Sequence, residues 1–92
     1  MSLTLACRPR LAPHARLHWD RFDERHMLLL PEAALVLDET ATTILQLCDG
    51  VRTLDAVVTD LCRAYEAPRE EIEADMLAFL GQLEGRGLLE AA

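Results

Sequence analysis

The sequence predicts a small α+β domain, in which a three-stranded antiparallel sheet is followed by three helices in an arrangement similar to a winged helix-turn-helix. Short apolar or alternating runs occupy the first part of the chain, and apolar residues at helical spacing fill the rest. The length of 92 residues, 51% of them hydrophobic, suits one domain with one core. We expect a single domain over 1–92, which divides into an extended N-terminal arm (1–15), a sheet (16–37) and a three-helix core (38–89).

An extended arm comes first because Pro9 and Pro13 disfavour helix: a proline ring fixes φ and restricts the residue before it. The five residues 16–20 then alternate between polar and apolar. Leu17 and Trp19 fall on the same face, which indicates a strand that is half buried. The sheet therefore begins with this strand.

Two further strands complete the predicted sheet. A charged turn over residues 21–25 leads to an apolar strand over 26–30. Pro31 then stands at the second position of a turn, where proline favours type I geometry. The chain returns in a third strand over 34–37, so the three strands form an antiparallel sheet.

The first helix is expected after Asp38, whose carboxylate is a good N-cap. Its apolar face recurs at spacings of three and four residues and consists of Ala41, Ile44, Leu45 and Cys48. Gly50 should end this helix, because glycine readily takes the left-handed conformation that follows a helix. We expect Val51 to fold back onto Leu45.

Two longer helices follow. Thr53 caps the second helix, and the third opens at Pro68 with two acids in its first turn, where the helix dipole favours negative charge. The apolar stripe of the second helix consists of Leu54, Val57, Val58, Leu61 and Tyr65. The stripe of the third consists of Ile72, Met76, Phe79, Leu80 and Leu83. Gly87 should end the third helix, with Leu88 folded back onto Leu83.

The charge is divided unevenly along the chain, whose net charge is −7. Residues 1–30 contain five arginines and three acids, whereas residues 31–92 contain four arginines and thirteen acids, a net −9. The third helix presents carboxylates where a DNA-reading helix presents Arg or Asn. Since phosphates would be repelled, we expect no nucleic-acid binding, and a winged-helix DNA-binding regulator is only the alternative.

Signals for membranes and secretion are not found in the sequence. The longest apolar run, Met27–Leu30, falls far short of the ~20 residues that a membrane helix needs. The first residues show no basic and apolar signal segment, and three cysteines cannot form a paired disulfide framework. We therefore expect a cytoplasmic protein with no membrane partner.

Metal and catalytic sites are not indicated either. The cysteines Cys7, Cys48 and Cys62 are too far apart for the close pairs that zinc sites use, so we expect no metal and no cofactor. The acids lie mostly on solvated helix faces, and all four glycines are isolated, so neither acid–base catalysis nor a phosphate loop is expected. Asp75 borders the apolar stripe of the third helix and is expected to pair with an arginine of the sheet.

The third strand, residues 34–37, is apolar on both faces, although the chain is too short to cover both with helices. A three-stranded sheet also has two edge strands, and each edge offers unpaired N–H and C=O groups. Such an edge accepts another chain by strand addition. The residues alone leave two interpretations open: a bound peptide, or burial within the domain or in a homodimer formed through the sheet edge.

Several short motifs occur in an order that is typical of one family. They are Arg16-Leu17-x-Trp19-Asp20, Pro31-Glu32, Leu37-Asp38-Glu39-Thr40-Ala41, Ile44-Leu45, Asp49-Gly50-x-Arg52-Thr53, Asp75-Met76, Phe79-Leu80 and Gly87-Leu88-Leu89. In this pattern, which covers roughly residues 8–89, the sequence closely resembles the PqqD family of pyrroloquinoline quinone (PQQ) biosynthesis. It departs from that family at Ala33, where many relatives have Gly, and at Asp38, where Asn is common.

The resemblance implies a winged-helix peptide-recognition protein without catalytic residues or a cofactor. Such a chaperone binds the leader of the precursor peptide PqqA and delivers it to the radical S-adenosylmethionine (SAM) enzyme PqqE. The peptide adds as a strand beside the third strand, against the third helix. Carried onto this chain, the peptide-binding positions are Ala34, Leu35, Val36, Leu37, Ile72, Met76, Phe79 and Leu80. A recognition domain for a different modified-peptide pathway is the alternative within this class.

A docking surface for the enzyme is expected in the first third of the chain, whose arginines contrast with the acidic helices. Complementary potentials steer encounter and set orientation, so an acidic partner surface would suit these arginines. The predicted docking residues are Arg16, Arg21 and Arg25, with Arg8 and Arg10 nearby in sequence. The rival interpretation, an enzyme of the quinone pathway, would need a cofactor site or a titratable pocket.

Overall fold

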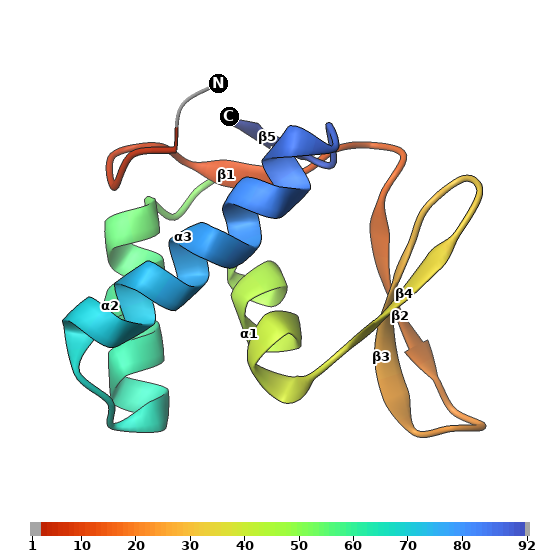
Figure 1. Cartoon of the computed structure of the whole chain (residues 1–92), viewed down its shortest axis with the longest axis horizontal. Coiled ribbons are helices and arrows are strands. Elements are labelled where there is room, and N and C mark those ends of the chain that lie inside the picture. The colour runs from red at the N-terminus through yellow and green to blue at the C-terminus, as the bar shows by residue number, and fades with distance from the viewer. Residues whose placement is uncertain (1–2, 92) are drawn as a thin grey trace.

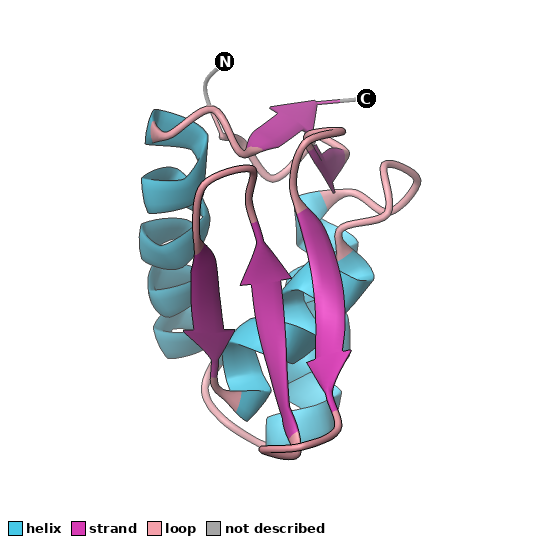
Figure 2. Cartoon of the chain, turned by 90° about the vertical axis from the view of Figure 1, so that its right-hand side faces the viewer, coloured by secondary structure: helices cyan, strands magenta, loops and turns pink. Residues whose placement is uncertain are grey.

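The computed structural model describes residues 3–91 and confirms the predicted α+β class. The helices lie on one face of a three-stranded antiparallel sheet (Figure 1), and no described element covers the other face (Figure 2). In chain order the elements are β1 (Pro9–Leu11), β2 (Arg16–Asp20), β3 (Arg25–Leu29), β4 (Ala34–Leu37), α1 (Glu39–Leu47), α2 (Leu54–Tyr65), α3 (Arg69–Gly85) and β5 (Leu89–Ala91).

The sheet follows the prediction closely. Its strand order is β2-β3-β4, and β2 and β4 have the predicted bounds, whereas β3 begins and ends one residue earlier. A tight turn with Pro31 and Glu32 at its centre joins β3 to β4. Across this turn the Leu30 N–H donates to the Ala33 carbonyl at 2.9 Å. Neither Pro31 nor Glu32 has a positive φ, which agrees with the predicted type I turn.

The predicted N-caps of α1 and α2 are confirmed. Asp38 Oδ1 accepts the Ala41 N–H at 2.7 Å, and Thr53 Oγ1 accepts the Ala56 N–H at 3.2 Å. These side chains satisfy N–H groups that have no partner inside the helix. α3 starts one residue later than predicted, because Pro68 is its N-cap and not its first helical residue.

The C-terminal ends of α1 and α3 differ. At α3 the predicted closure is present: Gly87 has φ +73°, and the Leu88 N–H donates to the Leu83 carbonyl at 2.9 Å. At α1, Gly50 has the predicted left-handed φ of +79°, but the predicted fold-back of Val51 is wrong, because Val51 is 69% exposed. The Asp49 carboxylate turns the chain instead, since it accepts the backbone N–H groups two and three residues later, each at 2.9 Å.

A second sheet of two strands is an addition to the predicted fold. β1 pairs antiparallel with β5, so that Pro9 lies opposite Ala91 and Leu11 lies opposite Leu89. β1 also contacts the connection between α1 and α2, because the Gly50 N–H donates to the Pro9 carbonyl at 2.8 Å. The arm that the prolines predict as merely extended is therefore tied to both the end and the middle of the chain.

The hydrophobic core lies between the inner face of the three-stranded sheet and the helices. Its fully buried side chains include Leu28, Leu54, Val57, Val58, Leu61, Met76 and Leu80. A domain of this size has one such core, and its binding sites must lie on the surface. No helix in the described part of the chain is long and apolar enough to span a bilayer.

Candidate functional site

β4 is an edge strand of the three-stranded sheet. The order β2-β3-β4 leaves one side of β4 without a strand partner among residues 3–91. Figure 2, in which β4 is the left-hand strand, shows this free edge on the side of the molecule where α3 lies. β4 then runs directly into α1 (Figure 1). A chain added to β4 would therefore continue toward α1 and α3.

The hydrogen-bond phase of the β3–β4 ladder decides which groups of β4 point outward. Leu30 and Ala33 form a hydrogen-bonded pair at the turn. Bonded and non-bonded pairs alternate along an antiparallel ladder, so Leu35 bonds to β3, whereas Ala34 and Val36 direct their N–H and C=O groups to the free edge. β4 thus offers main-chain donors and acceptors at two positions.

The side chains of β4 divide between the two faces of the sheet. Leu37 is buried and Leu35 half-buried, and both pack against the core. Ala34 and Val36 are exposed, and Val36 leaves 57% of its surface in solvent. The strand is apolar on both faces, but the protein covers only one of them.

Two cavities lie where β4 ends and α1 meets α3. The first, of about 320 Å³, is lined by Asp38, Thr40, Ala41, Ile44, Asp75 and Phe79. The second, of about 180 Å³, is lined by Thr40, Ile44, Leu61, Tyr65, Ala67, Glu71, Ile72, Asp75 and Met76. Both contain Thr40, Ile44 and Asp75, so we treat them as one depression and call it the α1–α3 groove.

The groove brings together some of the predicted peptide-binding residues but not all. Ile72 and Met76 line its second cavity, and Phe79 lines its first. Leu80 lines neither cavity and is fully buried among the core residues. Its place is therefore in the packing beneath the groove. The predicted peptide-binding residues do not include Ile44 of α1, which lines both cavities. Ile44 belongs to the apolar face of its helix, and the sequence pattern indicates a core position for such a residue.

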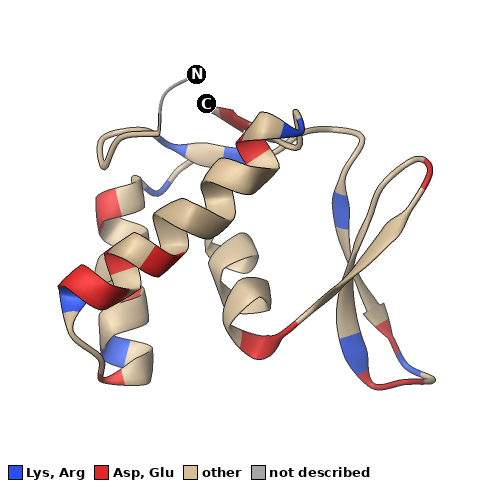
Figure 3. Ribbon diagram, in the orientation of Figure 1, with Lys and Arg blue, Asp and Glu red and all other residues tan. Residues whose placement is uncertain are grey.

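The groove is acidic as well as apolar. Asp38, Glu71 and Asp75 line it, and no Arg, Lys or His of residues 3–91 does. The ion pairs found within residues 3–91 include none of these three carboxylates. The expected pair between Asp75 and an arginine of the sheet is therefore wrong. Figure 3 shows the acids at the start of α1 and along the first half of α3.

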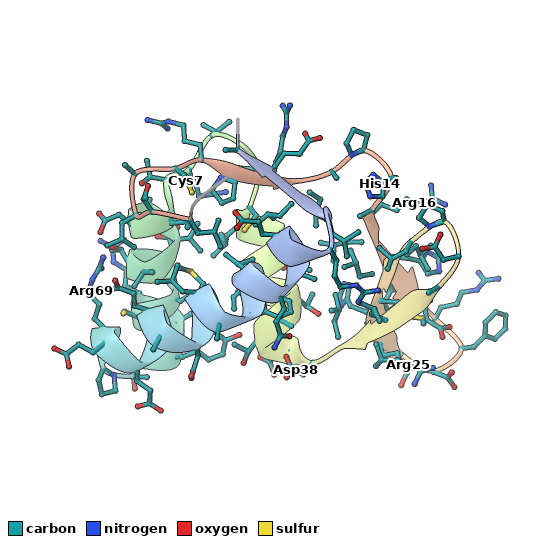
Figure 4. All side chains as sticks on the ribbon, turned by 45° about the horizontal axis from the view of Figure 1, so that its top comes forward. Cys7, His14, Arg16, Arg25, Asp38 and Arg69 are labelled. Carbon is teal, nitrogen blue, oxygen red and sulfur yellow. The ribbon has the colours of Figure 1, made fainter. Side chains whose placement is uncertain are left out.

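The three arginines predicted to dock an enzyme do not form one patch. Arg16 and Arg25 lie toward opposite ends of the sheet (Figure 4). Arg25 forms ion pairs with Asp23 at 3.3 Å and with Asp20 at 3.9 Å. Arg21 lies over the ring of Phe22, with 5.5 Å between its guanidinium carbon and the ring centroid.

Arg8 and Arg10 are also engaged locally. Arg8 donates to the Val51 carbonyl, and Arg10 pairs with Glu90 at 3.3 Å across the small sheet. Both lie at β1 or just before it, away from the β2–β3 hairpin. The five arginines of the first 25 residues are thus spread over separate surfaces of the protein.

The three thiols differ in their surroundings, and those of Cys48 suppress its reactivity. Burial, together with the neighbouring Asp49 carboxylate, raises the pKa of the Cys48 thiol to about 12. Cys7 and Cys62 are partly buried, and all three cysteines are free. Within residues 3–91, no three His, Cys, Asp or Glu side chains are grouped so that they could hold a metal ion.

Known proteins are similar to this chain in sequence and in fold. The family model described as "Coenzyme PQQ synthesis protein D (PqqD)" matches residues 25–89. The chain belongs to the PqqD family. The matched region runs from β3 to the start of β5, so it contains the β4 edge and every residue of the α1–α3 groove.

Relatives in this family resemble the chain over all or most of its length. A "PqqA binding protein" of Rhodopseudomonas palustris strain BisB5 is 40% identical over 92 residues, which is 100% of this chain and 90% of the relative. A "Bifunctional coenzyme PQQ synthesis protein C/D" of Methylorubrum extorquens is 38% identical over 82 residues. That match covers 89% of this chain and only 22% of the longer protein. PqqD-like sequences thus occur both alone and as part of a larger polypeptide.

Solved PqqD structures agree with the fold. The solution structure of the PqqD truncation of Methylobacterium extorquens PqqCD, described as a functional and stand-alone recognition element, has a TM-score of 0.81 and 35% identity. It is matched over 97% of this chain and 95% of its own. The crystal structure of PqqD from Xanthomonas campestris has a TM-score of 0.59 and 29% identity, over 97% and 99% of the two chains.

Proposed function

We propose that this chain is a peptide chaperone of PQQ biosynthesis that binds the precursor peptide PqqA and performs no chemistry itself. The proposal is supported by relatives at about 40% identity that are named PqqA binding proteins, and by the recognition element solved for Methylobacterium extorquens. The observation that carries it is the free β4 edge, which ends at an apolar groove. An edge with a groove beside it suits an extended peptide.

Strand addition explains how the two parts would act together. The outward N–H and C=O groups of Ala34 and Val36 would bond to the peptide backbone, which gives affinity without regard to sequence. Peptide side chains would enter the groove beside Phe79, Ile72 and Ile44, which gives selectivity. Leu35, Leu37, Met76 and Leu80 hold the strand and helix in place from within the core.

Peptide binding can be mapped directly on the labelled protein. Titration with the leader half of PqqA should shift the amide NMR signals of β4 and of the α1 and α3 residues in the groove. The signals of the outer edge of β2 serve as the control, since β2 is the opposite edge of the same sheet. Shifts confined to β2, or to the small β1–β5 sheet, would place the peptide elsewhere.

A homodimer through the sheet edge is the competing occupant of β4. Two copies paired along β4 would bury the same outward N–H and C=O groups that a peptide needs. The two occupants can be distinguished by sedimentation, which measures the oligomeric state of the protein before and after the peptide is added. A dimer that persists with the peptide bound would show that the β4 edge is not the peptide site.

We further propose that the chain presents the bound peptide to the radical SAM enzyme PqqE. The β2–β3 hairpin is the best candidate for docking, because Phe22 is 86% exposed and Arg21 beside it makes none of the ion pairs found in residues 3–91. The hairpin begins at the far edge of the sheet from β4, so both partners can bind at once. Holding substrate and enzyme together raises the local concentration of the substrate.

Presentation is tested by reconstitution with purified PqqE and PqqA. Cross-linking of the peptide should be sharply slower without the chain, and Phe22→Ala with Arg21→Glu should slow it while leaving peptide affinity unchanged. Val51→Ala is the control, because Val51 is also an exposed apolar residue, at 69%, but lies on the α1–α2 connection. Equal rates with and without the chain would rule out presentation. Binding of an unrelated precursor but not PqqA would assign the chain to another modified-peptide pathway.

A further inference from the structure

We propose that the α1–α3 groove selects a peptide that carries a lysine or arginine beside its apolar anchor residues, with Asp75 and Asp38 as the recognising carboxylates. The inference rests on the proposed function, because it requires that a peptide added to β4 continues into the groove. It adds to that function the type of peptide side chain that the groove recognises, which the names of the relatives do not give.

The position of the carboxylates is the first argument. Asp75 is the one charged residue that lines both cavities, and Asp38 lies in the first cavity, directly after β4. A peptide that extends past the Leu37 end of β4 would therefore lie near Asp38 and Asp75. Glu71 lies further along, in the second cavity.

The lack of local counter-charges is the second argument. The ion pairs within residues 3–91 use most of the arginines, yet none of them includes Asp38, Glu71 or Asp75. Asp38 uses Oδ1 to cap α1, and no hydrogen bond to its Oδ2 is found in the described chain. A carboxylate oxygen without a partner at the mouth of a groove is available to a cation from outside.

The apolar walls favour the same ligand. Ile44, Ile72 and Phe79 stand beside the carboxylates. Lys and Arg side chains bury their methylene stems along apolar surface while the charged head reaches a polar group. An acidic peptide would instead face three carboxylates in a protein whose net charge is already −7. The groove thus matches apolar anchors next to a basic residue.

Removal of single charges tests the inference on the protein side. Asp75→Asn keeps the shape and removes the charge, and it should weaken PqqA binding about 3–10-fold at low ionic strength, the range of a partly exposed charge pair. Asp38→Asn should also weaken binding, because it removes a carboxylate charge from the groove. The variant should keep α1 intact, because Asn caps a helix as well as Asp does. Glu70→Gln is the matched control: it removes one charge from the exposed first turn of α3 outside the groove, and it should change affinity less than about twofold.

Salt and charge reversal provide independent readouts. The difference between the wild type and Asp75→Asn should shrink at about 1 M salt, where the screening length falls to ~3 Å. Replacing each Lys and Arg of the synthetic peptide by Gln in turn should identify one position that loses affinity with the wild type but not with Asp75→Asn. Asp75→Lys should bind that peptide weakly and should recover binding when the same peptide position is Glu.

The outcomes distinguish this inference from the function on which it rests. If the wild-type chain does not bind PqqA, the proposed function fails. If it binds PqqA but Asp75→Asn, salt and the peptide substitutions leave the affinity unchanged, the function stands and the charge selection is wrong. Tighter binding of Asp75→Asn, or equal binding of a peptide without Lys or Arg, would also overturn the selection.

Discussion

Cys48 illustrates how a single position acquires its chemistry from burial. A thiol that is deprotonated only near pH 12 is neither a nucleophile nor a metal ligand at neutral pH. We expect thiol reagents at pH 8 to modify Cys7 and Cys62 well before Cys48 in the folded protein. Mass spectrometry of the partly modified protein measures this order, and fast modification of Cys48 would contradict the burial argument.

The same thiol makes stability depend on alkaline pH. The pKa of Cys48 is about 12 when folded and near its ordinary 9.0 when unfolded, so the unfolded state loses this proton first. Its contribution is complete below pH 9 and is lost as the pH rises toward 12. Cys48→Ala should cost about 1 kcal/mol of unfolding free energy at pH 7, and the gap to the wild type should narrow at pH 10. Urea unfolding at both pH values measures the gap, and a constant gap would rule out the linkage.

Asp49 is a second residue whose surroundings determine its role. Backbone N–H groups of Arg52 and Val51 donate to its carboxylate, and the Arg52 guanidinium adds an ion pair at 2.6 Å. These contacts lower the pKa of Asp49 below 3.8. Its contribution to stability is therefore present above pH 3.8 and is lost as the pH falls through the lowered folded value. Asp49→Ala should destabilise the protein at pH 7, and acid unfolding curves of the two proteins should converge below pH 3.8.

At the scale of elements, β4 combines an open edge with a fixed hydrogen-bond phase. Val36→Pro removes an outward N–H without removing a bond to β3, so it should leave the fold intact. It should weaken peptide binding by on the order of 1–3 kcal/mol, because one main-chain hydrogen bond is lost. Val36→Ala, which keeps the N–H, is the matched control and should change affinity little. Calorimetric titration with PqqA measures both, and equal affinities for the two variants would exclude strand addition at this position.

For the whole molecule, the charge distribution decides which partners are accepted. The net charge of −7 and the acidic α3 should prevent specific DNA binding, even though the helices resemble a DNA-binding arrangement. A gel shift with operator-like DNA at physiological salt should show no nanomolar complex. A complex that weakens steeply with salt would instead support the winged-helix regulator.

Much of the local structure is predictable from the sequence because it depends on neighbouring residues. Asp38, Thr53 and Gly87 act within one helical turn, so their caps can be recognised in the sequence and are present in the structure. The bounds of β2 follow from alternation over its five residues. The family, too, is recognisable from short motifs in order. The peptide-binding residues on β4 and α3 remain a prediction, although the structure places Ile72, Met76 and Phe79 in one groove.

Other features required the tertiary structure because they join residues that are far apart in the chain. The pairing of β1 with β5 links Pro9 to Ala91, and no local pattern in either three-residue strand predicts its partner. That Asp75 has no arginine partner within residues 3–91 depends on how the sheet and the helices pack. Short-range hydrogen bonds and apolar periodicity thus determined the three helices and the three strands of the larger sheet from the sequence alone. The pairing of β1 with β5, the groove, and the lack of ion pairs for its carboxylates within residues 3–91 were decided by the packing of elements distant in sequence.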